Sequence, residues 1–442
     1  MHKFIQSPGS SNVFRRRIQK LPATSYWLSF TGAPPPPSAK MISAMRDLSR
    51  RDFVKTASVA TIATAAPHLI AQETTMPSRN RVFIASGAPN GILAYDWDPA
   101  TAELTAVGVA AKAPSVDWVC FAPGRKHIYA ACEIDSFEGK PTGEVASFLL
   151  DAGELKPISA RASAGIGTCH VAVDATGRTL VAADYMGGSA ASFSISDGKL
   201  SEAVWTEHYK HHGPNADRQE AAHAHFVSFS PDNRYAYIND LGGDCIHIYA
   251  LNAALVGPSE SGAYPTPGIG VAAPALTPAG AYHAKPGAGC RTLHFHPNGR
   301  TAYCVNELIS TVDVLHWDRA TGGLTLVTSI HLLPDGYTGP TRGCDTVIPR
   351  DGRQVYFANR DNDFLYSFHA DPRTGALTPI GRTSCGGKIP RNFTLDPTEH
   401  WMLVANQDSN LISVFARNPQ TGVLANEGKS FPAPSPMCIL FL

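Results

Sequence analysis

A short apolar run that ends in a polar or small residue recurs seven times along the chain, and this repeat constrains the fold more than any other feature. The copies are VFIASG, IYAACE, LVAADY, YAYINDL, AYCVNE, VYFANR and LVANQ, which end at positions 87, 133, 185, 241, 307, 360 and 407. Successive copies lie about fifty residues apart, a period typical of β-propeller blades rather than of helical solenoids.

Turn-forming segments surround each copy. A turn resembling D-P-x-T-G-x-L, such as WDRATGGL or ADPRTGAL, follows most copies, and a second turn such as SPDNR or HPNGR precedes them. Asp, Pro and Gly favour the backbone geometry of hairpin turns. Each unit therefore contains four predicted strands, the number that a propeller blade requires.

The two ends of the chain are predicted to share one blade. The first copy begins directly at Arg81 and lacks the leading strand of the other copies, whereas residues 436–441 match that missing strand in position and apolar pattern. Such pairing would remove exposed sheet edges. The predicted fold is all-β, a seven-bladed β-propeller over residues 79–442 that the C-terminal strand closes. Residues 251–289, rich in Gly, Pro and Ala, are predicted to be a surface loop between blades.

Residues 1–78 are predicted to be a signal region and an irregular N-terminal extension. Ser49-Arg50-Arg51-Asp52-Phe53-Val54-Lys55 precedes an alanine-rich apolar run over residues 56–66, and this pattern resembles a twin-arginine export signal. The apolar run is shorter than the roughly 20 residues of a membrane-spanning helix. We therefore expect export by the twin-arginine machinery, signal cleavage, a periplasmic location and no stable membrane insertion afterwards. An N-terminal membrane anchor is the alternative.

Charge and cysteine content limit the partners. Lys+Arg and Asp+Glu both number 37, so no bulk positive field favours binding to nucleic acid. The nine cysteines form no C-x-x-C pair, and several lie in predicted strands as buried thiols. The sequence therefore predicts no cofactor and no metal site built on cysteine, and it indicates no oligomeric state.

Residues at equivalent positions of successive blades should form rings around the central channel. One ring comes from the leading strands, and the other follows the repeated apolar runs. The first comprises Asp117, Cys169, His225, Arg291, Cys344 and Arg391, and the second comprises Glu133, Tyr185, Leu241, Glu307, Arg360 and Gln407.

The polar members of these rings suit hydrolysis of an ester or lactone. Glu307 or His225 would act as a general base on water, and arginines would stabilise the oxyanion and hold an anionic substrate. No G-x-S-x-G elbow is present, so a covalent serine route has no support. Alternatively, Glu307 and Arg291 form a structural ion pair, and His223 with His225 line the channel or bind a metal.

Other polar groups are predicted to have structural roles. The recurring Asn306, Asn359 and Asn406, like Asp240 and Asp244, are interpreted as turn or strand-end caps. His208, His211 and His212 lie between the third and fourth units, where a solvated loop is expected.

The chain from about Arg81 onward resembles the bacterial lactonase family of seven-bladed propellers, which includes the propeller type of 6-phosphogluconolactonase and is related to carboxy-cis,cis-muconate lactonizing enzyme. The segments that carry the resemblance are AHAHFVSFSPDNRYAYINDLGGDCIHIY, GAGCRTLHFHPNGRTAYCVNELISTV, RGCDTVIPRDGRQVYFANRDND and IPRNFTLDPTEHWMLVANQDSNLISVF. One departure concerns Cys290-Arg291-Thr292, where relatives usually read Pro-Arg-His.

The resemblance implies a metal-free site of one histidine, one glutamate and two arginines. By residue match these are His225, Glu307, Arg291 and Arg360, with Arg342 and Arg391 as alternatives for the second arginine. We expect these four residues to be catalytic and His223, Arg391, Arg342 and Glu133 to bind substrate. The predicted function is an exported lactonase for a small sugar-derived or anionic lactone in carbohydrate metabolism. The alternatives are a non-catalytic periplasmic propeller that binds a sugar acid or a protein partner, and an enzyme that runs a related lactonizing reaction.

Overall fold

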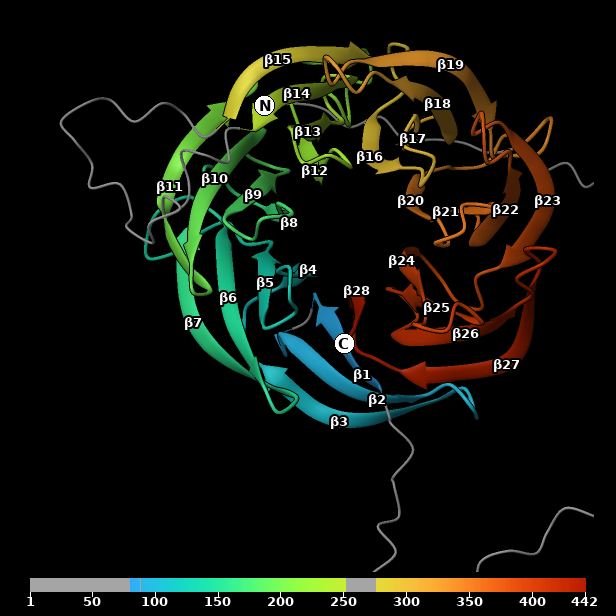
Figure 1. Ribbon diagram of the computed structural model, residues 1–442, viewed down its shortest axis with the longest axis horizontal. Coiled ribbons are helices and arrows are strands. Elements are labelled where there is room, and N and C mark those ends of the chain that lie inside the picture. The colour runs from blue at the N-terminus through green and yellow to red at the C-terminus, as the bar shows by residue number, and fades with distance from the viewer. Residues whose placement is uncertain (1–79, 88, 252–275) are drawn as a thin grey trace, which may run out of the picture. The chain divides into compact units, whose positions relative to one another are not determined.

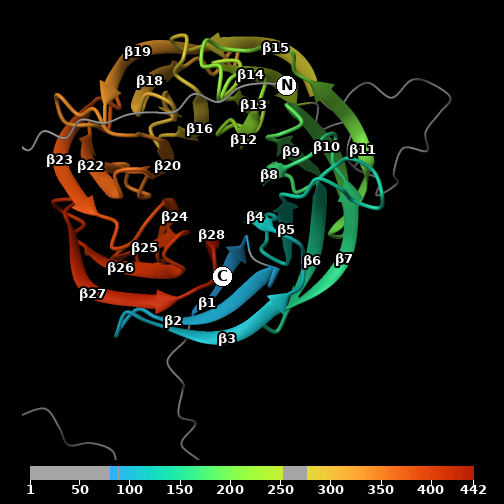
Figure 2. The ribbon, with the colours of Figure 1, turned by 180° about the vertical axis from the view of Figure 1, so that it is seen from behind.

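The computed structural model describes residues 80–87, 89–251 and 276–442, in which the chain forms β-strands and no helix. The strands form seven antiparallel four-stranded sheets arranged as blades around a central axis (Figures 1 and 2). The seven-bladed propeller predicted from the repeat is therefore confirmed. The described residues include no helix long and apolar enough to span a membrane. The predicted signal region, residues 1–78, lies outside the described residues.

Each blade is named here from its innermost strand to its outermost. Blade 1 contains β28 (Pro436–Phe441), β1 (Asn80–Ser86), β2 (Ile92–Asp98) and β3 (Glu103–Ala111); blade 2 contains β4 (Val116–Phe121), β5 (His127–Cys132), β6 (Glu144–Asp151) and β7 (Glu154–Ala162); and blade 3 contains β8 (Thr168–Val173), β9 (Thr179–Asp184), β10 (Ser189–Ser196) and β11 (Lys199–His208). Blade 4 contains β12 (Ala224–Phe229), β13 (Tyr235–Asp240), β14 (Cys245–Leu251) and β15 (Leu276–His283); and blade 5 contains β16 (Cys290–Phe295), β17 (Thr301–Asn306), β18 (Thr311–Trp317) and β19 (Leu324–His331). Blade 6 contains β20 (Gly343–Val347), β21 (Gln354–Asn359), β22 (Phe364–Ala370) and β23 (Leu377–Ser384); and blade 7 contains β24 (Pro390–Leu395), β25 (Trp401–Asn406), β26 (Leu411–Arg417) and β27 (Leu424–Pro432).

Blade 1 joins the two ends of the described chain. Strand β28 pairs antiparallel with β1, with Ile439 opposite Ile84 and Phe441 opposite Val82. Figure 1 shows the last strand, in red, beside the first strand, in blue. The predicted closure is therefore confirmed, and β28 covers the edge that β1 would otherwise expose in this blade.

The prediction of a loop over residues 251–289 was wrong in part. Residues 252–275 lie outside the described part of the chain, but Leu276–His283 form β15, the outermost strand of blade 4. The extra residues therefore fall within a blade rather than between two blades. Strand β15 begins Leu276-Thr277-Pro278 and continues with Gly and Ala, a composition that predicts a strand only weakly. Pairing with β14 supplies its backbone hydrogen bonds.

The T-G turns of blades 5, 6 and 7 each link their blade to the one before it. Tyr237, Tyr303 and Tyr356, each on the second strand of its blade, donate a hydrogen bond to a glycine carbonyl in the outer hairpin of the next blade, at 2.7, 2.7 and 3.0 Å. The acceptors are Gly322, Gly375 and Gly422, and each has a positive φ of 70–74° that favours glycine. The turn motif therefore stabilises the contacts between blades as well as each hairpin.

Apolar side chains fill the interfaces between blades. Between blades 4 and 5, Tyr237 and Ile248 pack against Leu293 and Cys304, and all four are at most 3% exposed. Truncation of a side chain such as Leu293 to alanine costs about 2–5 kcal/mol in a core of this kind. All nine cysteines are free thiols and eight of them are buried, as predicted for strand positions.

Candidate active site

A β-bulge at the same point of each innermost strand builds the inner ring of side chains. In every blade the register between the first and second strands shifts by one residue there, as between Cys290 and Thr292 in β16. A bulge turns its extra residue out of the regular alternation, often toward a functional site. The residues at the shifts are Asp117, Cys169, His225, Arg291, Cys344 with Asp345, Arg391 and Met437.

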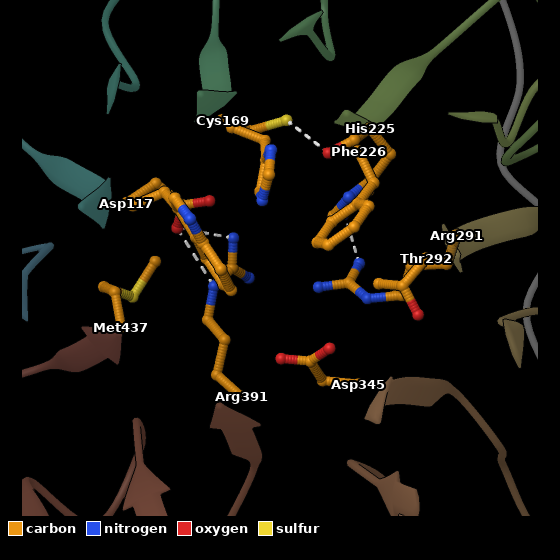
Figure 3. A pocket seen from close by; sticks show the side chains of 11 residues that line it. Asp117, Cys169, His225, Phe226, Arg291, Thr292, Asp345, Arg391 and Met437 are labelled. Carbon is orange, nitrogen blue, oxygen red and sulfur yellow. Dashed lines mark hydrogen bonds and ion pairs between the residues drawn. The ribbon is translucent and has the colours of Figure 1, made fainter. Parts of the chain in front are cut away.

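The first predicted ring is thus observed, and Met437 of β28 completes it. Figure 3 shows Asp117, His225, Arg291 and Arg391 pointing into one pocket on the propeller axis, with Asp345 and Met437 beside them. Thr292 also lines this pocket, and its buried hydroxyl has no partner among the described residues. The departure at residues 290–292 therefore changes the surface of the pocket itself.

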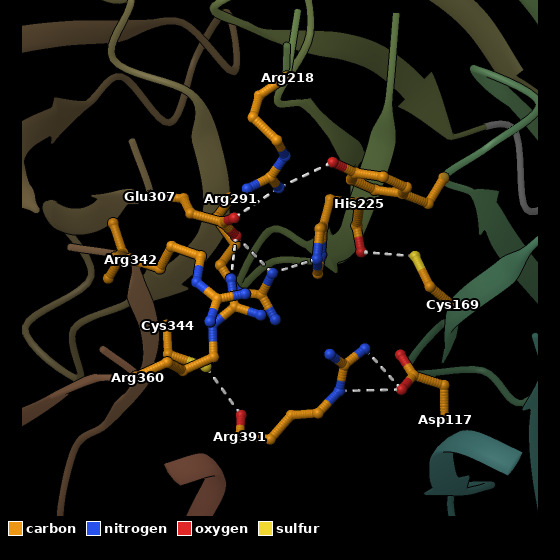
Figure 4. A network of polar contacts seen from close by, with 12 residues as sticks. Asp117, Cys169, Arg218, His225, Arg291, Glu307, Arg342, Cys344, Arg360 and Arg391 are labelled. Atoms are coloured by element: carbon orange, nitrogen blue, oxygen red, sulfur yellow. Dashed lines mark hydrogen bonds and ion pairs between the residues drawn. The ribbon is translucent and has the colours of Figure 1, made fainter. Parts of the chain in front are cut away.

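Glu307 is the centre of a buried ionic network. It follows β17 and has no exposed surface. One carboxylate oxygen, Oε2, lies 2.7 Å from Nη1 of Arg291 and 2.5 Å from Nη2 of Arg360, while Oε1 lies 2.7 Å from Nη2 of Arg218 (Figure 4). Nη1 of Arg291 also makes a hydrogen bond with Nε2 of His225. The structure therefore gathers the four residues predicted to be catalytic into one cluster.

This network carries an excess of positive charge. Three guanidinium groups surround one carboxylate, and Nε of Arg291 and Nε of Arg360 are buried without a hydrogen-bond partner among the described residues. Burial and the nearby charge of Arg291 lower the pKa of Arg360 to about 10, which still leaves the group charged at neutral pH. An anion would compensate this charge and accept the free N–H groups.

The acid and the histidine of the network both have a lowered pKa, for different reasons. Burial alone would raise the pKa of Glu307, but the charges of Arg360, Arg291 and Arg218 outweigh it and hold the pKa well below its ordinary value. For His225, burial followed by the charge of Arg291 lowers the pKa well below its ordinary value. At neutral pH the carboxylate is therefore ionised and the imidazole is neutral.

The residues predicted to bind substrate are distributed around this network. Arg391 forms an ion pair with Asp117 at 2.7 Å and lies 3.9 Å from Glu133. Arg342 pairs instead with Asp361 through Nε and Nη2 at 2.6–3.0 Å and is about one-third exposed, so it belongs to the rim of the site. Of the three arginines considered as the second arginine of the site, only Arg360 forms an ion pair with Glu307.

Glu133 occupies an unusual electrostatic environment. It follows β5, and one-third of its side chain is exposed. Burial and the negative charge of Asp117 raise its pKa to about 7, although Arg391 and Arg291 act in the opposite direction. A carboxylate with a pKa near neutral pH can exchange a proton during a reaction at that pH.

His223 makes aromatic and polar contacts rather than a ligand set. Its ring stacks on Tyr185 with centroids 4.5 Å apart, its Nδ1 lies 2.9 Å from the Tyr185 carbonyl oxygen, and its Nε2 lies 3.3 Å from Glu220. In the described part of the chain, no set of three potential metal ligands includes His223 or His225. His225 lines the axial pocket, and His223 lies beside it in contact with Tyr185.

Two residues of the network were not selected from the sequence. Arg218 lies in the connection between β11 and β12, which is longer than the other connections between described blades, so counting of the repeat could not identify it. Tyr185 was counted in the second ring but given no role, yet its hydroxyl accepts a hydrogen bond of 2.9 Å from Arg218. The preceding cluster of histidines and the sequence around Arg218 gave no specific signal.

Comparison with known proteins agrees with this architecture. The chain matches, over residues 81–441, the model of a family described as "Lactonase, 7-bladed beta-propeller". It is 29% identical over 359 residues to a 6-phosphogluconolactonase of Bacillus subtilis, an alignment that covers 80% of this chain and 95% of the relative.

Two solved structures have the same fold and moderate sequence identity. A putative 6-phosphogluconolactonase from Bacteroides fragilis superposes with a TM-score of 0.73 at 27% identity and covers 84% of this chain and 99% of its own. The periplasmic gluconolactonase of Pseudomonas aeruginosa superposes with a TM-score of 0.72 at 28% identity and covers 83% of this chain and 99% of its own.

Proposed function

Because the chain belongs to the lactonase family of seven-bladed β-propellers, we propose that it hydrolyses a small sugar-derived or anionic lactone at the network around Glu307. The observation that carries this proposal is the buried excess of positive charge beside unpaired N–H groups of Arg291 and Arg360. Attack of water on a lactone carbonyl develops negative charge on its oxygen, and preorganised donors stabilise such an oxyanion. Relatives named for 6-phosphogluconolactone and gluconolactone support a sugar-derived ring as substrate.

His225 acts in this proposal as a donor. Arginine has no acceptor lone pair, so in the contact between Arg291 and His225 the arginine donates to Nε2. A neutral imidazole then carries its hydrogen on Nδ1, which is buried without a partner among the described residues. His225 therefore offers an N–H group to the substrate instead of a lone pair to water.

Glu307 organises the arginines, and Glu133 accepts the proton. Three cationic groups occupy the oxygens of Glu307 and lower its basicity. Glu133 retains a pKa near 7 and belongs to blade 2, three blades from Glu307 around the ring (Figure 1). In this proposal the base and the oxyanion donors approach one carbonyl carbon from different blades.

Hydrolysis then proceeds by addition of water and opening of the ring. Glu133 removes a proton from water as the water oxygen bonds to the carbonyl carbon. Arg291, Arg360 and His225 donate hydrogen bonds to the oxyanion that forms. The ring C–O bond then breaks, and Glu133 returns the proton to the leaving alkoxide oxygen. The product is an open-chain hydroxy acid, whose carboxylate the arginines bind.

A direct assay tests the proposal. Purified protein is incubated with δ-gluconolactone and with 6-phosphogluconolactone, and acid release is followed by pH-stat titration against the spontaneous rate. We expect catalysed release from at least one lactone. Thermal stabilisation by gluconate or 6-phosphogluconate without any catalysed release would support the second candidate, a propeller that only binds a sugar acid, for which the same buried arginines would suffice.

Export is also part of the proposal. It is supported by the Ser49-Arg50-Arg51-x-Phe53-Val54-Lys55 pattern and by the similarity to a periplasmic gluconolactonase. Recognition by the twin-arginine machinery would leave the propeller in the periplasm after cleavage. Cell fractionation tests this prediction. The double substitution Arg50→Lys and Arg51→Lys should retain the protein in the cytoplasm, and unchanged export would reject the twin-arginine signal.

A further inference from the structure

Four side chains at the interface of blades 3 and 4 bring different metal-ligand atoms together, away from the network around Glu307. His211, Asp240, Cys245 and His247 each contribute one such atom, and these atoms all lie within 4.8 Å of one another. We propose that this cluster is a binding site for Zn²⁺ or a similar transition-metal ion. This proposal does not depend on the lactonase reaction.

Sheet geometry forces three of the four residues together. Cys245 and His247 are alternate residues of β14 and therefore project from the same face. Asp240, the last residue of β13, lies directly opposite Cys245 in the antiparallel register. His211 comes from the connection that leaves blade 3, and its ring centroid lies 5.4 Å from that of His247.

The distances between the ligand atoms suit a tetrahedral metal ion, although the Cys245 thiol and the His247 ring also lie within hydrogen-bond distance of each other. Nε2 of His247 lies 3.6 Å from Oδ2 of Asp240 and 3.5 Å from Sγ of Cys245. A metal with bonds of about 2.0–2.3 Å to nitrogen, oxygen and sulfur places tetrahedral ligands about 3.3–3.8 Å apart. Two imidazoles, a thiolate and a carboxylate are ligands that favour Zn²⁺ and Co²⁺ over Mg²⁺ or Ca²⁺.

Asp240 supplies independent support because one of its oxygens lacks a partner. Asp240 has no exposed surface; its Oδ1 accepts hydrogen bonds from the backbone N–H groups of His223 and Gly243 at 2.8 and 2.9 Å. Its Oδ2 is buried and has no hydrogen-bond partner among the described residues, although it faces His247. A buried carboxylate oxygen without a partner is costly unless a ligand compensates it.

Blade 3 provides an internal control for this interpretation. Asp184 ends β9 as Asp240 ends β13, and both of its oxygens are satisfied: Oδ1 accepts from Thr168, and Oδ2 accepts from Ser189 and the backbone of Gly165. Ser189 lies opposite Asp184 just as Cys245 lies opposite Asp240. Blade 4 thus has a thiol where blade 3 has a hydroxyl donor, and it gains His247 at the position of Ala191.

The surrounding residues hold the cluster closely. Tyr209 stacks on the His247 ring with centroids 3.9 Å apart and an angle of 6° between the planes. A Cβ atom on Gly243 would lie 2.5 Å from Oδ2 of Asp240 and 2.7 Å from Cβ of His211, so only glycine allows the two to approach. His211 is exposed, as predicted for a solvated loop, and Asp240 caps two backbone N–H groups, as predicted; the proposed metal site would give each residue a second role.

A metal at this position would fasten the connection between β11 and β12. That connection carries His211 at one end and Arg218 further along, and Arg218 reaches Glu307. The ion would thus cross-link blade 3 to blade 4 and stabilise the segment that supplies one of the three arginines. Its role is to position Arg218, and no reacting atom contacts it.

Cobalt binding tests the proposal with a readout other than activity. The full-length protein, without a polyhistidine tag, is stripped with a chelator and titrated with Co²⁺. We expect about one equivalent to bind, with the near-ultraviolet charge-transfer band of a thiolate ligand and visible bands of tetrahedral intensity. Zn²⁺ should displace the Co²⁺ and raise the melting temperature.

Matched variants separate this site from adventitious binding. His211 is exposed, so His211→Ala should fold normally yet weaken Co²⁺ binding about tenfold or more, whereas His212→Ala, on the neighbouring residue, should bind as the wild type does. Cys245→Ser should lose the charge-transfer band, and Cys385→Ser, a buried cysteine elsewhere, should keep it. Absence of the band in the wild type, or equal binding by the His211 and His212 variants, would overturn the proposal.

Discussion

Glu307 and Glu133 occupy equivalent positions in blades 5 and 2, yet their surroundings give them opposite chemistry. Each is the first residue after the second strand of its blade. Glu307 is fully buried among three arginines and its pKa is lowered, whereas Glu133 lies 3.9 Å from a single arginine and its pKa is raised to about 7. The repeat therefore fixes where a side chain lies, and the neighbouring residues decide what it can do.

The bulge residue of the same blade accounts for much of this difference. In blade 5 it is Arg291, which attracts Glu307, and in blade 2 it is Asp117, which repels Glu133. Arg391 of blade 7 then pairs with Asp117 rather than fully compensating Glu133. The same substitution at Glu307 and at Glu133 should thus change activity, stability and pH dependence differently.

Glu307→Gln should have the largest effect. Without the carboxylate the three arginines repel one another in a buried site, so we expect kcat/KM for the lactone substrate to fall about 10³-fold. Breaking a buried charge network also costs about 3–5 kcal/mol, which urea unfolding would measure. Unchanged turnover in a folded variant would reject the role of Glu307, whereas loss of stability with retained turnover would leave only a structural ion pair.

Arg360→Met tests the excess charge beside Glu307. Loss of one donor to the oxyanion should lower kcat/KM about 10²-fold. Arg417 is a matched control, since it is 4% exposed against 5% for Arg360 but binds Tyr356 and Gln354 at the interface of blades 6 and 7. Arg417→Met should reduce stability and leave kcat/KM per folded molecule unchanged. Equal losses of activity in both variants would indicate a general effect of removing a buried arginine.

Much of this architecture could be predicted from the sequence because blade packing repeats. The T-G turns, the apolar second strands and the position of the bulge residues recur, so the seven blades, their closure and the ring containing His225, Arg291 and Arg391 followed from spacing alone. The lactonase family and its enzyme class, inferred from the resemblance, are confirmed by the match over residues 81–441.

The parts of the fold and site that the sequence did not predict depend on features that occur only once in the described chain. Arg218 lies in an unusually long connection between blades 3 and 4, and β15 follows an insertion in the sequence, so the repeat indicated neither of them. The lowered pKa of Glu307 depends on Arg360 and Arg218, which are distant from it in sequence, as well as on Arg291 of its own blade. Spacing locates equivalent residues, but it does not give the sign of the field at each one.

Glu133→Gln tests the other glutamate through the pH profile. A base must be ionised to act, so kcat/KM of the wild type should be low below pH 7 and rise through the Glu133 pKa of about 7 to a plateau. The variant should lose this limb and fall about 10²-fold at the plateau. Glu144→Gln, a buried glutamate of the same blade, should retain the limb. A limb that persists in the Glu133 variant would assign the proton transfer to another group.

Tyr185→Phe should have the smallest effect. It tests the surroundings of Glu307 without changing those of Glu133. The Tyr185 hydroxyl accepts a hydrogen bond of 2.9 Å from Arg218, which in turn binds Glu307. Loss of one such bond is worth about 1 kcal/mol, so kcat/KM should fall about fivefold. The pH limb assigned to Glu133 should not move.

A hydroxyl removed elsewhere distinguishes this effect from general destabilisation. Tyr95 donates a hydrogen bond of 2.9 Å to the Pro432 carbonyl in the interface of blades 1 and 7, so Tyr95→Phe should cost similar stability without loss of kcat/KM. If Tyr185→Phe leaves kcat/KM unchanged, Arg218 is held by Glu307 alone. If instead the limb near pH 7 shifts, the two glutamates are electrostatically coupled across the channel, and the contrast between them reflects one shared network rather than two local environments.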